Sequence, residues 1–186
     1  MNPIKNKKDL EAKIDEIKNF AHSYLEKYSP SKQQLRIYLF KKLLKKKQKV
    51  YNKREIFNLI DSVITTLVDQ KLLSDEYYSD AKSKALLRRG YSLNKIRYNL
   101  IKQGIDQKYI KASISKIKEN ESDPDFFSAI KMCKRRRIGP IREESNRSLF
   151  YKKDISILAR SGFSYETSKR VLDIPKVEFI KFCKLI

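Results

Sequence analysis

The sequence predicts an all-α protein, built as an elongated, curved array of three tandem three-helix repeats. A short phrase at residues 100–106 recurs at 158–164, with a fainter copy around Leu39 and Leu43. In both clear copies an apolar run ends at a glycine, and an Asp or Ser follows that can cap the next helix. The copies lie about 60 residues apart, and repetition at a fixed interval is typical of modular arrays. Only 4 Gly and 5 Pro leave few turns for an all-β or Rossmann-like fold.

The first repeat, with an N-terminal extension, is expected over residues 1–73. Apolar residues at a spacing of three and four predict a helix over 9–28, which Ser29 and Pro30 end. Ser31 and Gln34 form a capping box for a second helix. A lysine-rich stretch at 45–49 leads to a third, strongly amphipathic helix over 56–68.

The second repeat is expected over residues 74–121 and the third, with a C-terminal tail, over 122–186. Acidic residues 75–76 open the second repeat, and Ser92 and Asp106 cap its later helices. Asp123 followed by Pro124 opens the third repeat. The stretch from 140 to 148 is predicted to be a loop or a partly flexible link. Helices follow over 150–160 and 165–172, and residues 177–186 form a short terminal helix or an extra docking segment.

Composition indicates the kind of partner and excludes several classes of function. The formal net charge is +21, which indicates an anionic partner such as nucleic acid, a membrane surface or an acidic protein assembly. Two cysteines without metal-ligand spacing indicate a reducing compartment, and the chain has no apolar run of the ~20 residues needed to cross a bilayer. A cytoplasmic protein is therefore predicted, with no role for a membrane.

Catalytic signatures are missing from the sequence. It contains no glycine-rich phosphate loop, and His22 is its only histidine, so multi-histidine metal sites and histidine acid–base relays are excluded. Paired carboxylates such as Asp75 with Glu76 lie at helix starts, where they stabilise the helix dipole, and this use is favoured over a metal-dependent nuclease. We therefore expect no enzyme activity, no metal and no cofactor.

An ordered series of short matches from about residue 24 to 172 resembles the RecX regulatory proteins. The series comprises Tyr24-Leu25 followed by Ser31 and Leu35, residues 72–81 running on to Arg89-Gly90, residues 100–105, and residues 158–164. Each match alone is weak, but their order is specific. The chain departs from the common pattern in its lysine-rich insertion between Leu44 and Lys53, in Tyr78 where Phe is frequent, and in its high charge.

The resemblance implies a modulator of the RecA recombinase that acts in homologous recombination, DNA repair and the SOS response. RecX-like proteins are built of three-helix repeats and bind in the groove of the RecA filament on single-stranded DNA. They limit strand exchange, ATP turnover and coprotease action, and have no catalytic residues. A monomer that contacts single-stranded DNA directly or through the filament is expected. The alternative is a basic helical protein that binds nucleic acid directly.

Three basic clusters are the candidate contact regions. The first runs from Lys41 to Arg54, the second from Lys82 to Lys102 with no acidic residue between Asp80 and Asp106, and the third comprises Lys131, residues 134–137 and Arg142. Tyr91, Tyr98 and Tyr109 lie near the second cluster, where packing between helices is favoured over base stacking. The predicted filament-binding or nucleic-acid-binding residues are Lys84, Arg88, Arg89, Lys95, Arg97, Lys102, Lys134, Arg135, Arg136, Arg137 and Arg160.

Overall fold

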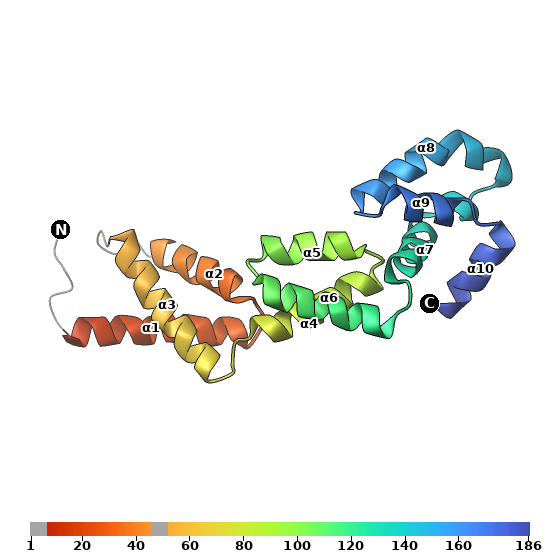
Figure 1. Ribbon diagram of the computed structural model, residues 1–186. Helices are drawn as coiled ribbons and strands as arrows, with labels where there is room; N and C mark the ends of the chain where they lie inside the picture. The colour runs from red at the N-terminus through yellow and green to blue at the C-terminus, as the bar shows by residue number, and fades with distance from the viewer. Residues whose placement is uncertain (1–6, 46–51) are drawn as a thin grey trace. The chain divides into compact units, whose positions relative to one another are not determined.

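The computed structural model describes residues 7–45 and 52–186, and all regular structure in these ranges is helical (Figure 1). It consists of ten α-helices and one 3-10 turn, so the predicted all-α class is confirmed. The division into three equivalent repeats stays a prediction. Most of the lysine-rich stretch, residues 46–49, lies outside the described residues.

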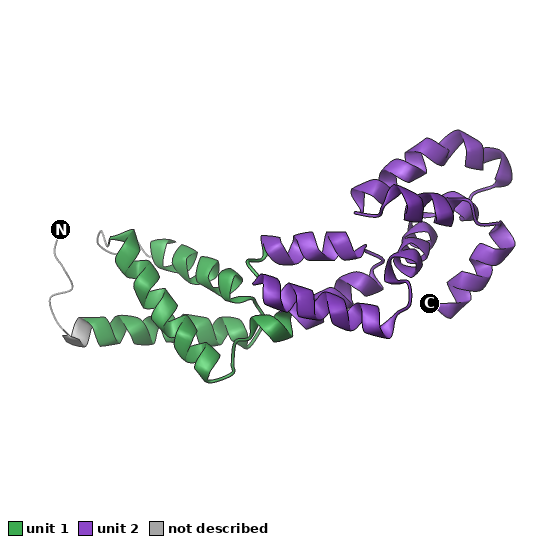
Figure 2. Cartoon of the chain, viewed as in Figure 1, with its two compact units in different colours: residues 1–78, 103–105 green, residues 79–102, 106–186 purple. Residues whose placement is uncertain are grey.

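The chain divides into two compact units, coloured separately in Figure 2. Unit 1 comprises residues 1–78 and 103–105, and unit 2 comprises residues 79–102 and 106–186. Unit 1 holds α1 (Lys7–Leu25), α2 (Lys32–Lys45), α3 (Lys53–Asp69) and the first turn of α4 (Asp75–Arg88). Unit 2 holds the rest of α4, with α5 (Leu93–Lys102), α6 (Gln107–Asn120), α7 (Pro124–Arg136), η1 (Gly139–Ile141), α8 (Glu144–Arg160), α9 (Tyr165–Leu172) and α10 (Lys176–Leu185).

The core of unit 1 forms where α1, α2 and α3 pack against one another. Each helix is apolar along one stripe only, so three helices are needed to remove these stripes from water. Leu35 and Leu39 of α2 are fully buried against Ile60 and Leu67 of α3 and Ile17 of α1. The predicted phase of the second and third helices is therefore confirmed.

Unit 2 has a core around α7, α8, α9 and α10. Ile130 and Cys133 of α7, Leu158 of α8 and Val171 of α9 are fully buried in one cluster, together with Phe179 of α10. Nearer the start of the unit, α5 and α6 pack together through a stripe of buried residues comprising Ile96, Leu100, Ile110, Ile114 and Ile117.

The predicted helix caps are present where their groups are described. Ser31 N–H donates to Gln34 Oε1 (3.0 Å) and Gln34 N–H donates to Ser31 Oγ (3.2 Å), which completes the capping box. Asp106, Asp123 and Ser164 accept hydrogen bonds from the first turns of α6, α7 and α9. The sequence pattern therefore located these helix starts correctly.

The segment before Ser148 differs from its prediction. It was expected to be a loop, but η1 occupies residues 139–141 and α8 already begins at Glu144. The early start is held by tertiary contacts, because Arg147 donates to the main-chain oxygens of Leu172 and Ile174 (2.9 and 3.1 Å). Arg147 also pairs with Glu144 three residues earlier (3.2 Å), so the turn has one local partner beside its two distant ones.

Candidate interaction surface

A hydrogen-bonded joint in unit 1 links the start of α2 to two distant segments. Ser31 Oγ is fully buried and donates to the main-chain oxygen of Gln103 (2.9 Å). Asp75, at the start of α4, accepts the main-chain N–H of Lys32 through its Oδ1 (2.9 Å). Gly104 lies against Gln33, where a Cβ would come within 2.8 Å of the Gln33 side chain. We call Ser31, Lys32, Asp75, Gln103 and Gly104 the first joint.

The same arrangement recurs in unit 2 at the start of α5. Ser92 Oγ donates to the main-chain oxygen of Ser161 (2.9 Å), and Leu93 N–H donates to Asp125 Oδ1 (2.7 Å). A Cβ on Gly162 would lie 2.5 Å from Ser92 Oγ, so the close approach requires glycine there. We call Ser92, Leu93, Asp125, Ser161 and Gly162 the second joint. In each joint a serine caps its own helix while its hydroxyl also binds the turn beside a glycine.

Two carboxylates therefore have a role that sequence reasoning missed. Asp75 was expected to serve its own helix start, but Asp75 and Asp125 each accept an N–H from a different helix, across 43 and 32 positions of sequence. Partial burial raises the pKa of Asp125, and the hydrogen bond from Leu93 opposes this shift. No local pattern distinguishes such a carboxylate from an ordinary helix-start residue.

The second and third basic clusters meet at the turn between α4 and α5. Gly90 in this turn has a positive φ of 73°, and a Cβ there would lie 2.8 Å from the Ser128 oxygen and 3.0 Å from Lys131 Cβ of α7. The guanidinium of Arg135 lies 5.8 Å from the centroid of the Tyr91 ring, which follows Gly90. Arg88 and Arg89, immediately before this glycine, are exposed. Arg88, Arg89 and Arg135, which are three of the predicted cations, thus flank the contact between the Gly90 turn and α7.

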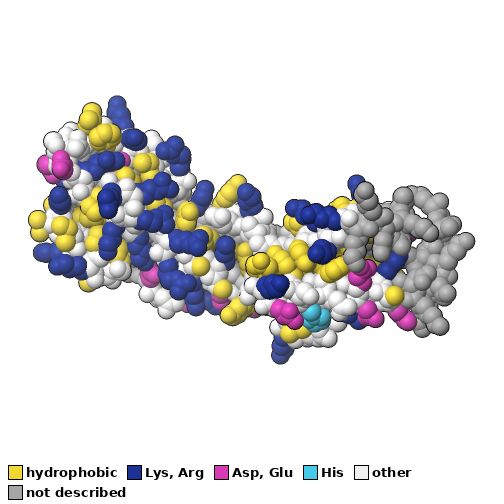
Figure 3. Space-filling model, turned by 180° about the vertical axis from the view of Figure 1, so that it is seen from behind, with side chains coloured by type: hydrophobic (Ala, Val, Ile, Leu, Met, Phe, Trp, Pro, Cys, Tyr) yellow, Lys and Arg dark blue, Asp and Glu magenta, His cyan; other side chains and the backbone are white. Residues whose placement is uncertain are grey.

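The second joint adds two further predicted cations to this region. Lys95 follows Ser92 in α5, and its main chain lies against Gly162. Arg160, the last residue of α8, precedes the Ser161–Gly162 turn and is exposed. Lys and Arg side chains outnumber acidic ones on the face of unit 2 that Figure 3 shows at the left. Lys95 and Arg160 therefore lie beside the second joint, and the cations of the Gly90 turn lie just before it in the sequence.

Other predicted cations lie in different surroundings. Lys134 Nζ donates to the main-chain oxygen of Cys183 in α10 (3.0 Å), and Arg97 donates to Asn94 (3.1 Å). Arg136 and Arg137 are exposed at the end of α7, where Arg137 has a φ of 53° and closes the helix. Lys102 is exposed at the end of α5. Within the described ranges, the predicted residues do not all converge on one place.

Lys84 lines a shallow hollow of about 360 Å³ between α4 and α6. Beside it, Asp80 accepts hydrogen bonds from Ser113 Oγ and Lys116 Nζ, each at 2.5 Å. Desolvation alone raises the pKa of Asp80, but these hydrogen bonds and the charges of Lys116 and Lys84 outweigh it and lower the pKa. Lys84 therefore helps to hold Asp80 ionised, in addition to being exposed to a partner.

Arg142, placed in the third cluster from sequence, is a structural residue. Its guanidinium binds both oxygens of Asp154 (2.8 Å each), and this carboxylate is 1% exposed. Asp154 also accepts the Gly139 N–H (2.8 Å). Arg142 stacks on Phe150 as well, at 4.6 Å from the ring centroid. A bidentate pair that compensates a buried charge leaves this arginine unsuited to an external anion.

The expectation for Tyr98 is wrong. This ring was expected to pack between helices, but it is 59% exposed on α5, with Lys95 Nζ at 5.5 Å from its centroid. Tyr91 and Tyr109 are half-buried. Ile96 and Leu100 are fully buried, and the helical period puts Tyr98 on a different face of α5 from both of them. The spacing in the sequence could therefore have predicted that Tyr98 is exposed.

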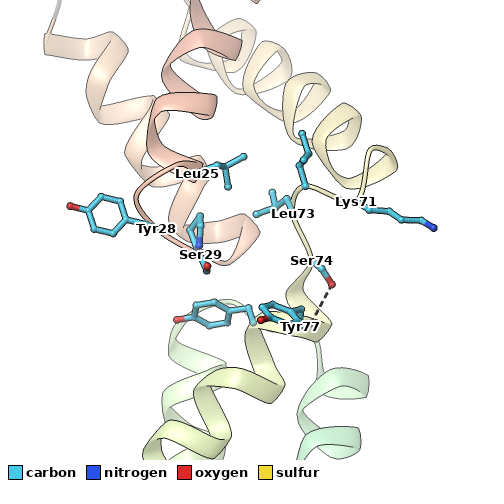
Figure 4. A pocket seen from close by; sticks show the side chains of 10 residues that line it. Leu25, Tyr28, Ser29, Lys71, Leu73, Ser74 and Tyr77 are labelled. Carbon is cyan, nitrogen blue, oxygen red and sulfur yellow. Dashed lines mark hydrogen bonds between the residues drawn. The ribbon is translucent and has the colours of Figure 1, made fainter.

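A second hollow, of about 400 Å³, lies in unit 1 between the end of α1 and the start of α4 (Figure 4). Tyr28 and Tyr77 border it and are 58% and 69% exposed. Ser74 Oγ accepts the Tyr77 N–H (3.2 Å), so this hydroxyl caps α4. Burial raises the pKa of Tyr78, which also lines the hollow. The lining is mainly apolar and aromatic, without a cluster of catalytic groups.

Among residues 7–45 and 52–186, no three His, Cys, Asp or Glu side chains lie in a group that could hold a metal ion. None of the described helices combines the length and apolar character that spanning a membrane requires. Cys133 and Cys183 are free thiols, and burial raises the pKa of Cys133 to about 12.

Comparisons with known proteins agree with the fold and with the sequence resemblance. No protein-family profile matches the chain. The chain is 28% identical over 159 residues to the regulatory protein RecX of Myxococcus xanthus strain DK1622, and the match covers 84% of each chain. The fold is similar to the crystal structure of RecX from Lactobacillus salivarius, with a TM-score of 0.57 and 17% identity over 93% of this chain and 97% of that one.

A further crystal structure, of a regulatory protein RecX, matches with a TM-score of 0.60 and 17% identity, and covers 93% of this chain and 80% of that one. At this identity the two structures support the fold alone. The Myxococcus relative adds a sequence match over most of the chain, and its name is that of a regulatory protein and not of an enzyme. By sequence and by fold, the chain is similar to RecX regulatory proteins.

Proposed function

We propose that this protein binds in the groove of the RecA filament on single-stranded DNA and mostly inhibits its recombinase, ATPase and coprotease activities. It acts as a monomer in the cytoplasm and meets single-stranded DNA directly or through the filament. The observation that supports the proposal is that predicted cations of α4 and α7 flank the Gly90 turn while Lys95 and Arg160 lie beside the second joint, in a chain similar to RecX regulatory proteins.

The mechanism follows from a positively charged surface whose helices are held in place by the second joint. The charge of +21 attracts an anionic nucleoprotein polymer at long range. The second joint fixes α5 against the α8–α9 turn, so cations on these helices meet the partner without being ordered first. Several modest contacts made together give a long residence time. A protein held in this way blocks addition of the next recombinase subunit or locks neighbouring subunits in one arrangement.

The test uses substoichiometric protein and measures RecA-catalysed ATP hydrolysis on single-stranded DNA. We expect hydrolysis to fall. The variant Arg88→Gln, Arg89→Gln, Arg135→Gln removes the three cations that flank the Gly90 turn, and we expect it to inhibit more weakly. The control variant Lys111→Gln, Lys169→Gln, Lys176→Gln loses the same charge from exposed positions on α6, α9 and α10. Unchanged hydrolysis with the wild-type protein would contradict the proposed function.

Direct binding of nucleic acid is the second candidate. It is favoured by the exposed Tyr98 ring with Lys95 above it, since a base can stack on an aromatic face beside a cation. A groove regulator binds the assembled filament much more tightly than naked DNA. A plain DNA-binding protein binds both equally, and log K falls against log salt with a slope of roughly 0.7–0.9 per phosphate contact.

A further inference from the structure

Helices α2, α5 and α8 present an equivalent exposed pair of residues. Each helix contains a fully buried leucine, at Leu39, Leu100 and Leu158. Two residues after each leucine stands a cation, and two residues before it stands a second exposed residue. Positions four apart share one face of a helix, and this face is opposite the buried leucine. We call these the outward pairs: Ile37 with Lys41, Tyr98 with Lys102, and Ser156 with Arg160.

Interactions within the protein do not account for the three cations. In the described part of the chain, Lys41, Lys102 and Arg160 make no ion pair or side-chain hydrogen bond. Neighbouring cations do find partners, since Arg36 binds Asp61 at 2.6 Å and Arg97 binds Asn94 at 3.1 Å. Lys102 and Arg160 lie in the last turns of α5 and α8, where they also stabilise the helix dipole, but Lys41 precedes the last turn of α2, so the dipole does not explain the position that all three share.

The surroundings of the first two outward pairs indicate a protein partner, whereas the third pair has Ser156 in place of an apolar residue. Ile37 and Tyr98 are 43% and 59% exposed, and Ile101 and Leu44 beside the cations are 48% and 50% exposed. A base can stack on Tyr98, but the aliphatic side chains of Ile37, Ile101 and Leu44 beside cations match protein surfaces, which combine apolar and charged groups. A cation next to an apolar side chain therefore complements a carboxylate next to an apolar patch.

Recurrence of the pair at intervals of about 60 residues indicates that the partner repeats as well. Resting on the proposed function, we infer that Lys41, Lys102 and Arg160 are equivalent docking residues, each of which binds a carboxylate on a different protein subunit of the filament. The filament supplies identical subunits, and the chain supplies one outward pair to each. The affinity for the filament is then the product of three similar contributions, one from each outward pair.

The experiment compares single and combined charge-neutralising variants with the matched control described above. Lys41→Gln, Lys102→Gln and Arg160→Gln are made singly and together, and all three sites are exposed, so thermal melting should not change. Affinity is measured for a RecA filament assembled on poly(dT) with a slowly hydrolysed ATP analogue, and for naked poly(dT). We expect each single variant to lose about 5-fold in filament affinity and the triple variant about 100-fold.

Three outcomes would overturn the inference while leaving the proposed function intact. In the first, the triple variant binds the filament as tightly as the Lys111, Lys169, Lys176 control. In the second, one substitution accounts for the whole loss, so the three residues are not equivalent. In the third, affinity for naked poly(dT) falls in parallel and the salt slope decreases by roughly 0.7 per residue, which indicates phosphate contacts. If the wild-type protein does not bind the filament, the proposed function itself is wrong.

Discussion

Removing the Ser92 hydroxyl tests whether the second joint holds unit 2 together. Ser92 is fully buried, and its Oγ accepts the Lys95 N–H (3.1 Å) while it donates to the Ser161 oxygen (2.9 Å). In Ser92→Ala both main-chain groups lose this partner. Ser164 offers a matched control, because it caps α9 through the Thr167 N–H (3.0 Å) but is exposed to solvent.

The expected magnitudes follow from this difference. Loss of a serine cap costs about 1 kcal/mol, and a buried carbonyl left without a donor costs about 1–3 kcal/mol more. Ser92→Ala should therefore lower the free energy of unfolding by about 2–4 kcal/mol. Ser164→Ala should cost about 1 kcal/mol, because water replaces the hydroxyl there. Ser31→Ala in the first joint should match Ser92→Ala, since Ser31 is equally buried and donates to the Gln103 oxygen.

Thermal unfolding followed by far-ultraviolet circular dichroism measures these effects. For a chain of this length 1 kcal/mol shifts Tm by about 2–4 °C, so we expect a decrease of about 4–16 °C for Ser92→Ala and about 2–4 °C for Ser164→Ala. Equal shifts for the two variants would refute the reasoning, because the extra cost comes entirely from the buried bond between distant segments. A normal Tm for Ser31→Ala would show that the two joints are not energetically equivalent.

Three further variants test other parts of the structure. Leu100→Ala should lower stability by ~2–5 kcal/mol in urea unfolding because it empties a fully buried site, and unchanged stability would contradict the assigned helical phase. Arg142→Ala should cost ~3 kcal/mol because it leaves the buried Asp154 without its cation, whereas Arg142→Lys should recover part of this. Because the pKa of Asp125 is raised above 3.8, its ionisation opposes folding, so the free energy of unfolding should fall as pH rises from below 3.8 through the raised pKa. Asp125→Asn keeps an oxygen for Leu93 and should abolish this fall, and an identical pH dependence in both proteins would exclude the assignment.

Local signals predicted most helix boundaries correctly. The Ser31–Gln34 capping box and the Asp123 cap join groups three residues apart, so the sequence alone contains both partners. The glycines at 104 and 162 adopt the predicted left-handed conformation, with φ of 73° and 87°. Where the start of a helix depends on a distant partner, as Arg147 on Leu172, prediction placed it too late.

Prediction of the interaction surface was less complete, because a cation looks the same in sequence whatever it binds. Arg142 and Arg160 are both arginines in basic surroundings, yet Arg142 binds the buried Asp154 and Arg160 is exposed. Tyr98 was expected to be packed and is exposed. These outcomes depend on which side chains fold next to each residue, and composition does not contain that information.

The sequence by itself determined the helical class, the caps, the apolar stripes and the excess of positive charge, because these depend on groups within about four residues of each other or on composition. Tertiary structure alone decided that Asp75 and Asp125 cap helices 43 and 32 positions away and that Ser31 and Ser92 bind turns 72 and 69 positions away. It also decided which cations remain available to a partner. The physical reason is that a hydrogen bond between distant segments forms only when the apolar stripes of their helices pack in one arrangement, which brings donor and acceptor within reach.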